Sequence, residues 1–166
     1  MTTTGYLHRP DGPGPFPAVI PLHGCDGLAL NTVSQASWNV QREYARRYVE
    51  RRFAALVIDS FSARGTHSIC SNISIRAKEV AWDAYAAHRM LGSLGYVDKN
   101  RIIVQGLSHG GGAVLAALEK GAWPIPERFA AGIAFYPRCY IASDGFSAPL
   151  SVFIGEPMIG RRPIGA

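Results

Sequence analysis

Hydrophobic residues in this chain gather in short runs, and longer stretches with apolar residues at helical spacing separate these runs. The runs predict buried strands at residues 17–22, 53–58, 101–105, 131–136 and 150–154. The helical spacing predicts helices at residues 36–52 and 76–94 and an alanine-rich helix through residues 113–118. Residues 5–16, rich in Gly and Pro, are expected to form an edge strand or a loop, and residues 98–100 a turn.

The alternation of buried strands with helices predicts an α/β fold, with a mostly parallel sheet covered by helices on both faces. The length of 166 residues suits one domain, residues 1–166, and the chain shows no internal repeat or linker. Functional sites in such sheets lie at the carboxyl ends of the strands. The chemistry is therefore expected in the turns that follow the predicted strands.

Composition and charge exclude several classes of protein. Hydrophobic residues make up 48% and charged residues 17%, which excludes a disordered chain, and no apolar run is long enough to span a membrane. The N-terminus lacks the pattern of a signal peptide. The net charge of +5 includes an arginine cluster at residues 42–52, but Glu43 and Glu50 interrupt it, which favours a solvated helix face. We expect neither a nucleic-acid nor a membrane partner.

The three cysteines, Cys25, Cys70 and Cys139, show no CxxC spacing. An odd count without that motif predicts neither a disulfide framework nor a zinc site, so no metal is expected. A reducing, cytoplasmic location is the default expectation. The sequence leaves open one cysteine pair in an exported protein.

The strongest chemical signal is Gly106-Leu107-Ser108-His109-Gly110, which matches the G-x-S-x-G nucleophile elbow. A predicted strand runs into it and an alanine-rich helix follows it, and a sharp turn there requires small neighbours such as Gly106 and Gly110. We therefore predict Ser108 as the nucleophile. The alternative is a glycine-rich turn that binds phosphate at a helix N-terminus, but the GxGxxG and Gly-Lys-Ser/Thr patterns are both absent.

A second glycine-containing turn, His23-Gly24-Cys25-Asp26-Gly27, follows the first buried strand. In this architecture the oxyanion donors are the N–H after the nucleophile and an N–H from such a loop. We therefore predict the backbone amides of His109 and Cys25 as donors, with Gly24 giving the loop its freedom. The side chains of His23 and His109 are interpreted as structural. A catalytic thiolate at Cys25 is not expected, because no general base lies nearby in the sequence.

Taken together, the chain resembles the dienelactone hydrolase family of the α/β-hydrolase fold. The resemblance covers about residues 5–156, and its motifs are these segments: residues 14–20, 22–25, 59–65, 98–102 leading into the elbow, 135–137, 148–150 and 153–156. It implies hydrolysis of carboxylic esters or lactones by a nucleophile–histidine–acid triad, with no cofactor.

Two positions refine what the resemblance implies. The dienelactone enzymes use Cys at the elbow, so Ser108 points to carboxylic-ester hydrolysis in general. Arg64 in Ala63-Arg64-Gly65 matches the family's arginine that contacts a substrate carboxylate. The alternative role of Arg64, capping a helix from a loop, is equally compatible with its position.

The rest of the triad is not found. The chain has no histidine after His109, and the resemblance places the acid at position 158, which is Met158. Nothing in the spacing of His23, His67 or His88 favours one of them as a substitute base. A serine without a base is a weak nucleophile, so impaired catalysis is expected. The alternative is an inactive small-molecule-binding module or a truncated pseudoenzyme.

The tail at residues 157–166 does not fit the family pattern, in which relatives often continue Gly-Glu-Ala-Asp-Asp-Trp-Thr-Pro-Ala. Deleting one base after the Glu156 codon of one such coding sequence yields Gly-Glu-Pro-Met-Ile-Gly-Arg-Arg-Pro, which is residues 155–163. We hypothesise an out-of-frame tail and a domain that lacks its last strand and helix. Strand 150–154 would then be an exposed apolar edge through which the chain could self-associate.

Overall fold

Six strands form one sheet in the computed structural model, which describes residues 3–28, 35–139 and 144–155. The strands are β1 (Thr4–His8), β2 (Phe16–Leu22), β3 (Ala54–Asp59), β4 (Val97–Leu107), β5 (Ala131–Phe135) and β6 (Leu150–Phe153). Their order across the sheet is β1-β3-β2-β4-β5-β6. Only β1 pairs in the antiparallel sense, with β3, and the other neighbours are parallel. The predicted α/β fold with a mostly parallel sheet is confirmed, and the predicted tail at residues 157–166 lies outside the described residues.

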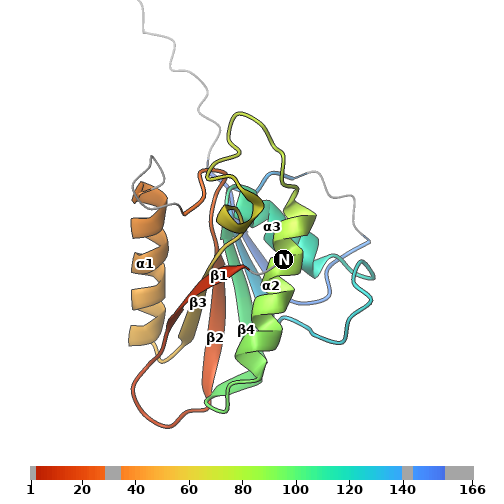
Figure 1. The fold of residues 1–166 in the computed structure, drawn as a ribbon. Coiled ribbons are helices and arrows are strands. Elements are labelled where there is room, and N and C mark those ends of the chain that lie inside the picture. Colours follow the sequence, from red (N-terminus) through yellow and green to blue (C-terminus); the bar gives the residue numbers. More distant parts are fainter. Residues whose placement is uncertain (1–2, 29–34, 140–143, 156–166) are drawn as a thin grey trace, which may run out of the picture.

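Helices cover both faces of this sheet (Figure 1). One face carries α1 (Gln35–Glu50), which packs mainly on β3 and β2, and the other carries α2 (Ala77–Gly92) and α3 (His109–Leu118). A short 3₁₀ helix, η1 (Ser62–Arg64), follows β3. Parallel strands that are covered on both faces carry continuous hydrophobic runs, and all six residues of β3 are buried.

The main core lies between the sheet and the α2–α3 layer. Its largest fully buried side chains include Ile20, Tyr85 and Leu118, and all ten residues of α3 are buried. A smaller cluster under α1 includes Val19, Trp38 and Val57. The two faces of the sheet are therefore unequally covered, and the elbow helix α3 belongs to the more deeply buried one.

The predicted turn at residues 98–100 is instead part of β4, at a bulge. Phe16 pairs with Val97, and two residues later Ala18 pairs with Ile102, so β4 has extra residues between these positions. The Asp98 carboxylate accepts hydrogen bonds from the Asn100 amide at 3.0 Å and from the Arg101 side chain at 2.7 Å. These local bonds resemble those of a turn, which explains why the sequence suggested one.

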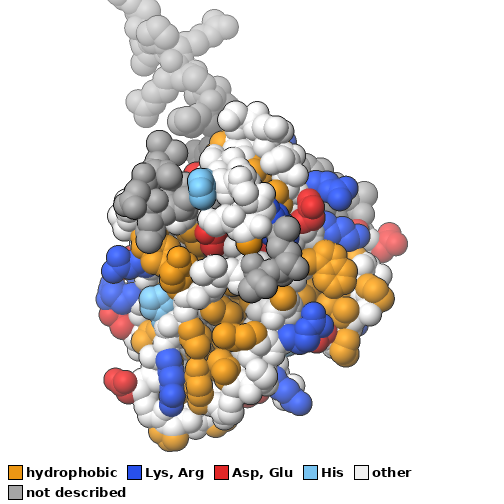
Figure 2. All heavy atoms as spheres, viewed as in Figure 1, with side chains coloured by type: hydrophobic (Ala, Val, Ile, Leu, Met, Phe, Trp, Pro, Cys, Tyr) orange, Lys and Arg blue, Asp and Glu red, His pale blue; other side chains and the backbone are white. Residues whose placement is uncertain are grey.

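Hydrophobic side chains are exposed along β6, which is an edge of the sheet. Val152 is 42% exposed, Phe153 52% and Ile154, just beyond the strand, 73%. The face seen in Figure 2 shows scattered Lys and Arg side chains rather than one basic patch. None of the helices in the described part of the chain is long and apolar enough to cross a membrane.

Candidate active site

The carboxyl ends of the central strands meet at one edge of the sheet. Leu22 at the end of β2 pairs with Gly106, and Leu107 at the end of β4 pairs with Phe135. The turns after β2, β4 and β5 therefore leave the sheet at the same level. This register places the predicted loop at residues 23–27 directly beside the predicted elbow.

Ser108 stands alone between the last residue of β4 and the first residue of α3. Its backbone has φ 53° and ψ −110°, a combination that non-glycine residues rarely adopt. The Ser108 amide donates to the Phe135 carbonyl at 2.8 Å, and its carbonyl accepts from the Gly112 amide at 3.0 Å. Both backbone groups are thus held by neighbouring elements, which offsets the cost of the strained conformation.

The glycines around Ser108 meet a steric requirement. A Cβ atom on Gly106 would lie 2.1 Å from the carbonyl oxygen of Gly110, and one on Gly110 would lie 2.5 Å from the carbonyl oxygen of Leu22. These contacts are far inside van der Waals distance. The sharp strand-to-helix turn therefore exists only because both positions lack a side chain.

The loop after β2 lies against the elbow. A Cβ atom on Gly24 would be 3.8 Å from the Ser108 Cβ, and the Gly27 amide donates to the Gly24 carbonyl at 3.3 Å. The Cys25 amide donates no hydrogen bond to the described backbone, and the His109 amide begins α3, where N–H groups lack a partner in the helix. Neither amide therefore donates a hydrogen bond to another described residue.

His23 is buried and both of its ring nitrogens are engaged. The Ser60 amide donates to Nε2 at 3.2 Å, so Nε2 accepts and the proton resides on Nδ1, which donates to the Gly24 carbonyl at 2.8 Å. Burial lowers the pKa of His23, so the neutral ring is favoured. The ring thus ties the loop after β2 to the end of β3 and has no nitrogen free for proton transfer.

No described side chain forms a hydrogen bond with the hydroxyl of Ser108. The His109 ring is buried, and neither of its nitrogens has a hydrogen-bond partner among the described residues. Burial is the main cause that lowers the pKa of His109, and the nearby backbone of Ile75 acts in the opposite direction. His67 is exposed, and its Nδ1 lies 3.5 Å from the Ser62 hydroxyl. A general base for Ser108 is therefore missing from the described residues.

Arg64 lies in η1 and forms a bidentate ion pair with Asp83 of α2. The two N–O distances are 2.6 Å and 3.0 Å, and the Arg64 and Asp83 side chains are only 18% and 10% exposed. Arg64 also donates to the Ser60 carbonyl. Its predicted role in binding a substrate carboxylate therefore requires that a ligand share or displace Asp83. The sequence analysis did not identify Asp83, although its place among buried residues of α2 marks it as an acid that needs a partner.

Asp59 is the last residue of β3, shortly before η1, and its carboxylate is held by several hydrogen bonds. It accepts hydrogen bonds from the amides of Phe61 at 2.9 Å and Ser62 at 3.1 Å, and from the Ser62 hydroxyl at 2.6 Å. Burial alone would raise the pKa of Asp59, but these hydrogen bonds outweigh it and hold the pKa below its ordinary value. Asp59 is thus an ionised anchor for the turn into η1.

Cys25 and Cys70 form a disulfide, with Cα atoms 4.9 Å apart. This is the single cysteine pair that the sequence left open, and it forms because the fold brings together two cysteines 45 residues apart in the sequence. Cys139 is free and exposed. No group of three or more potential metal ligands occurs within residues 3–28, 35–139 and 144–155.

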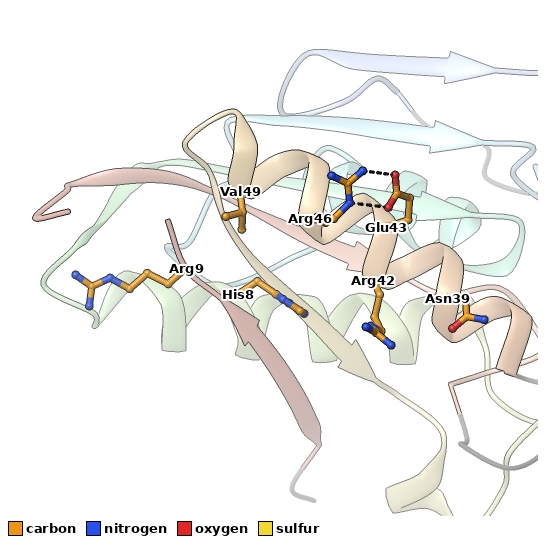
Figure 3. Close-up of a pocket in the computed structure, with 7 residues that line it drawn as sticks. All are labelled: His8, Arg9, Asn39, Arg42, Glu43, Arg46 and Val49. Carbon is orange, nitrogen blue, oxygen red and sulfur yellow. Dashed lines mark hydrogen bonds and ion pairs between the residues drawn. The ribbon is translucent and has the colours of Figure 1, made fainter. Parts of the chain in front are cut away.

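A groove of about 500 Å³ lies elsewhere, between β1 and α1 (Figure 3). His8 and Arg42 both line it, and burial together with the charge of Arg42 lowers the pKa of His8. His8 pairs with Ala55 near the start of β3, at the end of the sheet away from the elbow. None of the predicted site residues lines this groove, so it is separate from the candidate active site.

Comparison with known proteins gives similarity to hydrolases. A model of the prolyl oligopeptidase family matches residues 76–146, which include the elbow. The quorum-quenching protein AidA of Acinetobacter baumannii is 27% identical over 150 residues. That match takes in 90% of this chain but 43% of AidA, so the chain spans less than half the length of this curated relative.

Solved structures show the same fold. A candidate dienelactone hydrolase from Klebsiella pneumoniae superposes with a TM-score of 0.65 at 18% identity, covering 89% of this chain and 59% of that one. A thermophilic esterase from Thermogutta terrifontis, solved with propionate bound, superposes with a TM-score of 0.57 at 19% identity, covering 82% and 50%. This chain therefore has the α/β-hydrolase fold.

Proposed function

We propose that this chain carries the acyl-transfer site of a serine hydrolase that acts on carboxylic esters or lactones. The observation that carries the proposal is the backbone of Ser108, with φ 53° and ψ −110°, at the junction of β4 and α3. A strained serine in that place, beside two amides that donate to no other described residue, is the arrangement that acyl transfer requires. Similarity to proteins named as esterases and dienelactone hydrolases supports the reaction class.

In the proposed reaction the Ser108 oxygen attacks the substrate carbonyl and loses its proton. The carbonyl oxygen becomes an oxyanion, which the amides of Cys25 and His109 stabilise, and the alcohol leaves as the acyl-enzyme forms. Water then releases the acid. Because no described residue serves as base, the proton must pass to solvent, and we propose that turnover is strongly impaired in this chain.

A catalytically inactive binding module is the second candidate. The hydroxyl of Ser108 forms no hydrogen bond with a described side chain, which favours this candidate because an activated serine is normally hydrogen bonded to its base. Such a module would retain a small ester or lactone at the same edge of the sheet without cleaving it.

Covalent labelling with a fluorophosphonate distinguishes the two candidates. We expect slow labelling of the wild type at Ser108, none in Ser108→Ala, and no change in Ser151→Ala, which alters an exposed serine on β6. Peptide mass spectrometry would locate the adduct. Labelling of the folded wild type no faster than that of Ser108→Ala would overturn the hydrolase proposal and favour the binding module.

Further sequence expectations remain proposals. We propose that Arg64 contacts acidic substrates and that the edge strand β6 mediates self-association. A cytoplasmic location is also only a prediction, and the Cys25–Cys70 bond weighs against it because disulfides persist mainly in oxidising compartments. Cell fractionation with a thiol-trapping reagent would test both the location and the redox state.

A further inference from the structure

We infer that Cys70 is a positioning residue for the oxyanion hole, acting through its disulfide with Cys25. The inference rests on the proposed function, since it assigns a task to the Cys25 amide. It concerns Cys70, which lies outside the elbow and outside the loop after β2.

Residues 68–70 hold Cys25 through three bonds. The Ile69 amide donates to the Cys25 carbonyl at 2.8 Å, the Ser68 hydroxyl donates to that carbonyl at 3.3 Å, and Cys70 is joined to the Cys25 sulfur. The side chain and carbonyl of Cys25 are thus both fixed by residues 68–70. The Cys25 amide is not used in these bonds, and it is the group that stabilises the oxyanion in the proposed mechanism.

The segment that holds Cys25 is itself anchored. Ile69 is 1% exposed and belongs to the main core. The segment also touches the loop directly, because a Cβ atom on Gly27 would lie 2.2 Å from the carbonyl oxygen of His67. Ile69 therefore links the loop after β2 to the core, and the disulfide makes that link covalent.

The consequence for catalysis follows from the distance dependence of oxyanion stabilisation. A donor contributes when it lies about 2.7–3.1 Å from the oxyanion, and loss of one donor lowers the rate about 10²- to 10³-fold. Without the covalent link, the loop at residues 23–27 has more conformations available, because Gly24 and Gly27 restrict the backbone little. The Cys25 amide then occupies the productive position for a smaller fraction of the time.

The same bond makes the site sensitive to reductants. Cys70 is exposed, so a dithiol can reach the disulfide. One dithiol supplies two electrons and two protons, the S–S bond breaks, Cys25 and Cys70 become thiols, and the reagent becomes a cyclic disulfide. Reduction should therefore weaken the oxyanion hole without altering Ser108.

The test compares wild type, Cys25→Ser, Cys70→Ser and the double variant, with Cys139→Ser as the matched control at the free cysteine. We expect each single variant to lower the maximal fluorophosphonate labelling rate by about tenfold, the double variant to equal the singles, and Cys139→Ser to match wild type. The probe concentration for half-maximal rate should stay unchanged, because the amide acts on the transition state. Dithiothreitol should slow wild type to the level of Cys70→Ser and leave that variant unaffected.

Hydrogen exchange supplies a readout that does not depend on labelling. Reduction should speed amide exchange in a peptide spanning residues 23–28 while exchange in α2 stays constant, which separates loop release from global unfolding. The inference is overturned if the loop exchanges equally in both redox states, if Cys70→Ser labels as fast as wild type, or if native protein shows three free thiols. An unlabelled wild type whose loop still responds to reduction would instead refute the proposed function alone.

Discussion

The elbow after β4 and the β6 edge are separated by one strand, β5, yet they are stabilised in opposite ways. The elbow is enclosed: Gly106 and Gly110 touch backbone atoms, His109 is 1% exposed, and the whole of α3 is buried. Within the described residues, strand β6 pairs with β5 alone and exposes Val152 and Phe153. Ser108 is thus held by close backbone packing, whereas the strand two positions away exposes apolar side chains.

The contrast indicates that the geometry of a nucleophile elbow depends on a few adjacent elements. It needs two strands in register, one helix and two glycines, all of which the described residues supply. Stability of the sheet edge depends instead on whatever covers or pairs it. The geometry of the nucleophile can therefore be complete where the edge is not.

The largest effect is expected from adding one methyl group at the elbow. Gly106→Ala would place a Cβ atom 2.1 Å from the Gly110 carbonyl oxygen, so we expect a loss of more than about 3 kcal/mol of unfolding free energy. Gly95→Ala is the matched control, because a Cβ atom there meets nothing within 4 Å. Urea denaturation of both variants checks this, and equal midpoints would show that the elbow is not closely packed.

An intermediate effect is expected from acid, again at the elbow. Burial holds the pKa of His23 and His109 below the ordinary 6.5, so the unfolded chain takes up protons first as the pH falls. Unfolding free energy should therefore be constant above pH 6.5 and fall below it, by up to about 1.4 kcal/mol per pH unit for each histidine.

Urea titrations at several pH values from 7.5 to 5 would measure this slope. His67→Gln alters an exposed histidine and should leave the slope as it is, whereas His109→Phe should reduce it. A stability that does not change with pH over this range would contradict a neutral, buried pair.

The smallest effect on stability is expected at the edge. Val152→Lys changes a 42% exposed side chain, so unfolding free energy should change by no more than about 0.5 kcal/mol. A lysine on an edge strand opposes strand pairing, so self-association should fall. Leu7→Lys, on the opposite edge strand β1, is the control and should leave association unchanged. Sedimentation velocity would show the difference. If both variants self-associate to the same extent as wild type, β6 is excluded as the interface.

The parts of the fold predictable from sequence are those that a local pattern encodes. The strands from residue 17 onward follow the predicted apolar runs, and their ends differ from the predicted ones by a few residues, most at β4. The exposure of β6 does not follow from its apolar sequence. The elbow was predictable because its motif is local in sequence: Gly106 and Gly110 both lie within two residues of Ser108. The contacts of Gly110 with Leu22 and His23, in contrast, arise only in the folded chain. The bulge in β4 was missed because Asp98 makes turn-like bonds inside an extended strand.

Pairings across the sequence were not predictable in the same way. Cys25 meets Cys70 and Arg64 meets Asp83 only after β2, β3 and α2 have packed together, and neither pair has a sequence motif. The partners can be recognised one at a time, as a cysteine or a half-buried acid, but their contacts depend on tertiary structure.

The helix α3 has a further consequence for how such a chain can diverge. All ten of its residues are buried, so a substitution at any of them would change the packing of the core. Several residues of the loops after β3 and β5 face fewer such restrictions, because they are exposed, and Tyr136 after β5 is 59% exposed. Evolutionary change is therefore expected to accumulate in these loops rather than in Ser108 and α3.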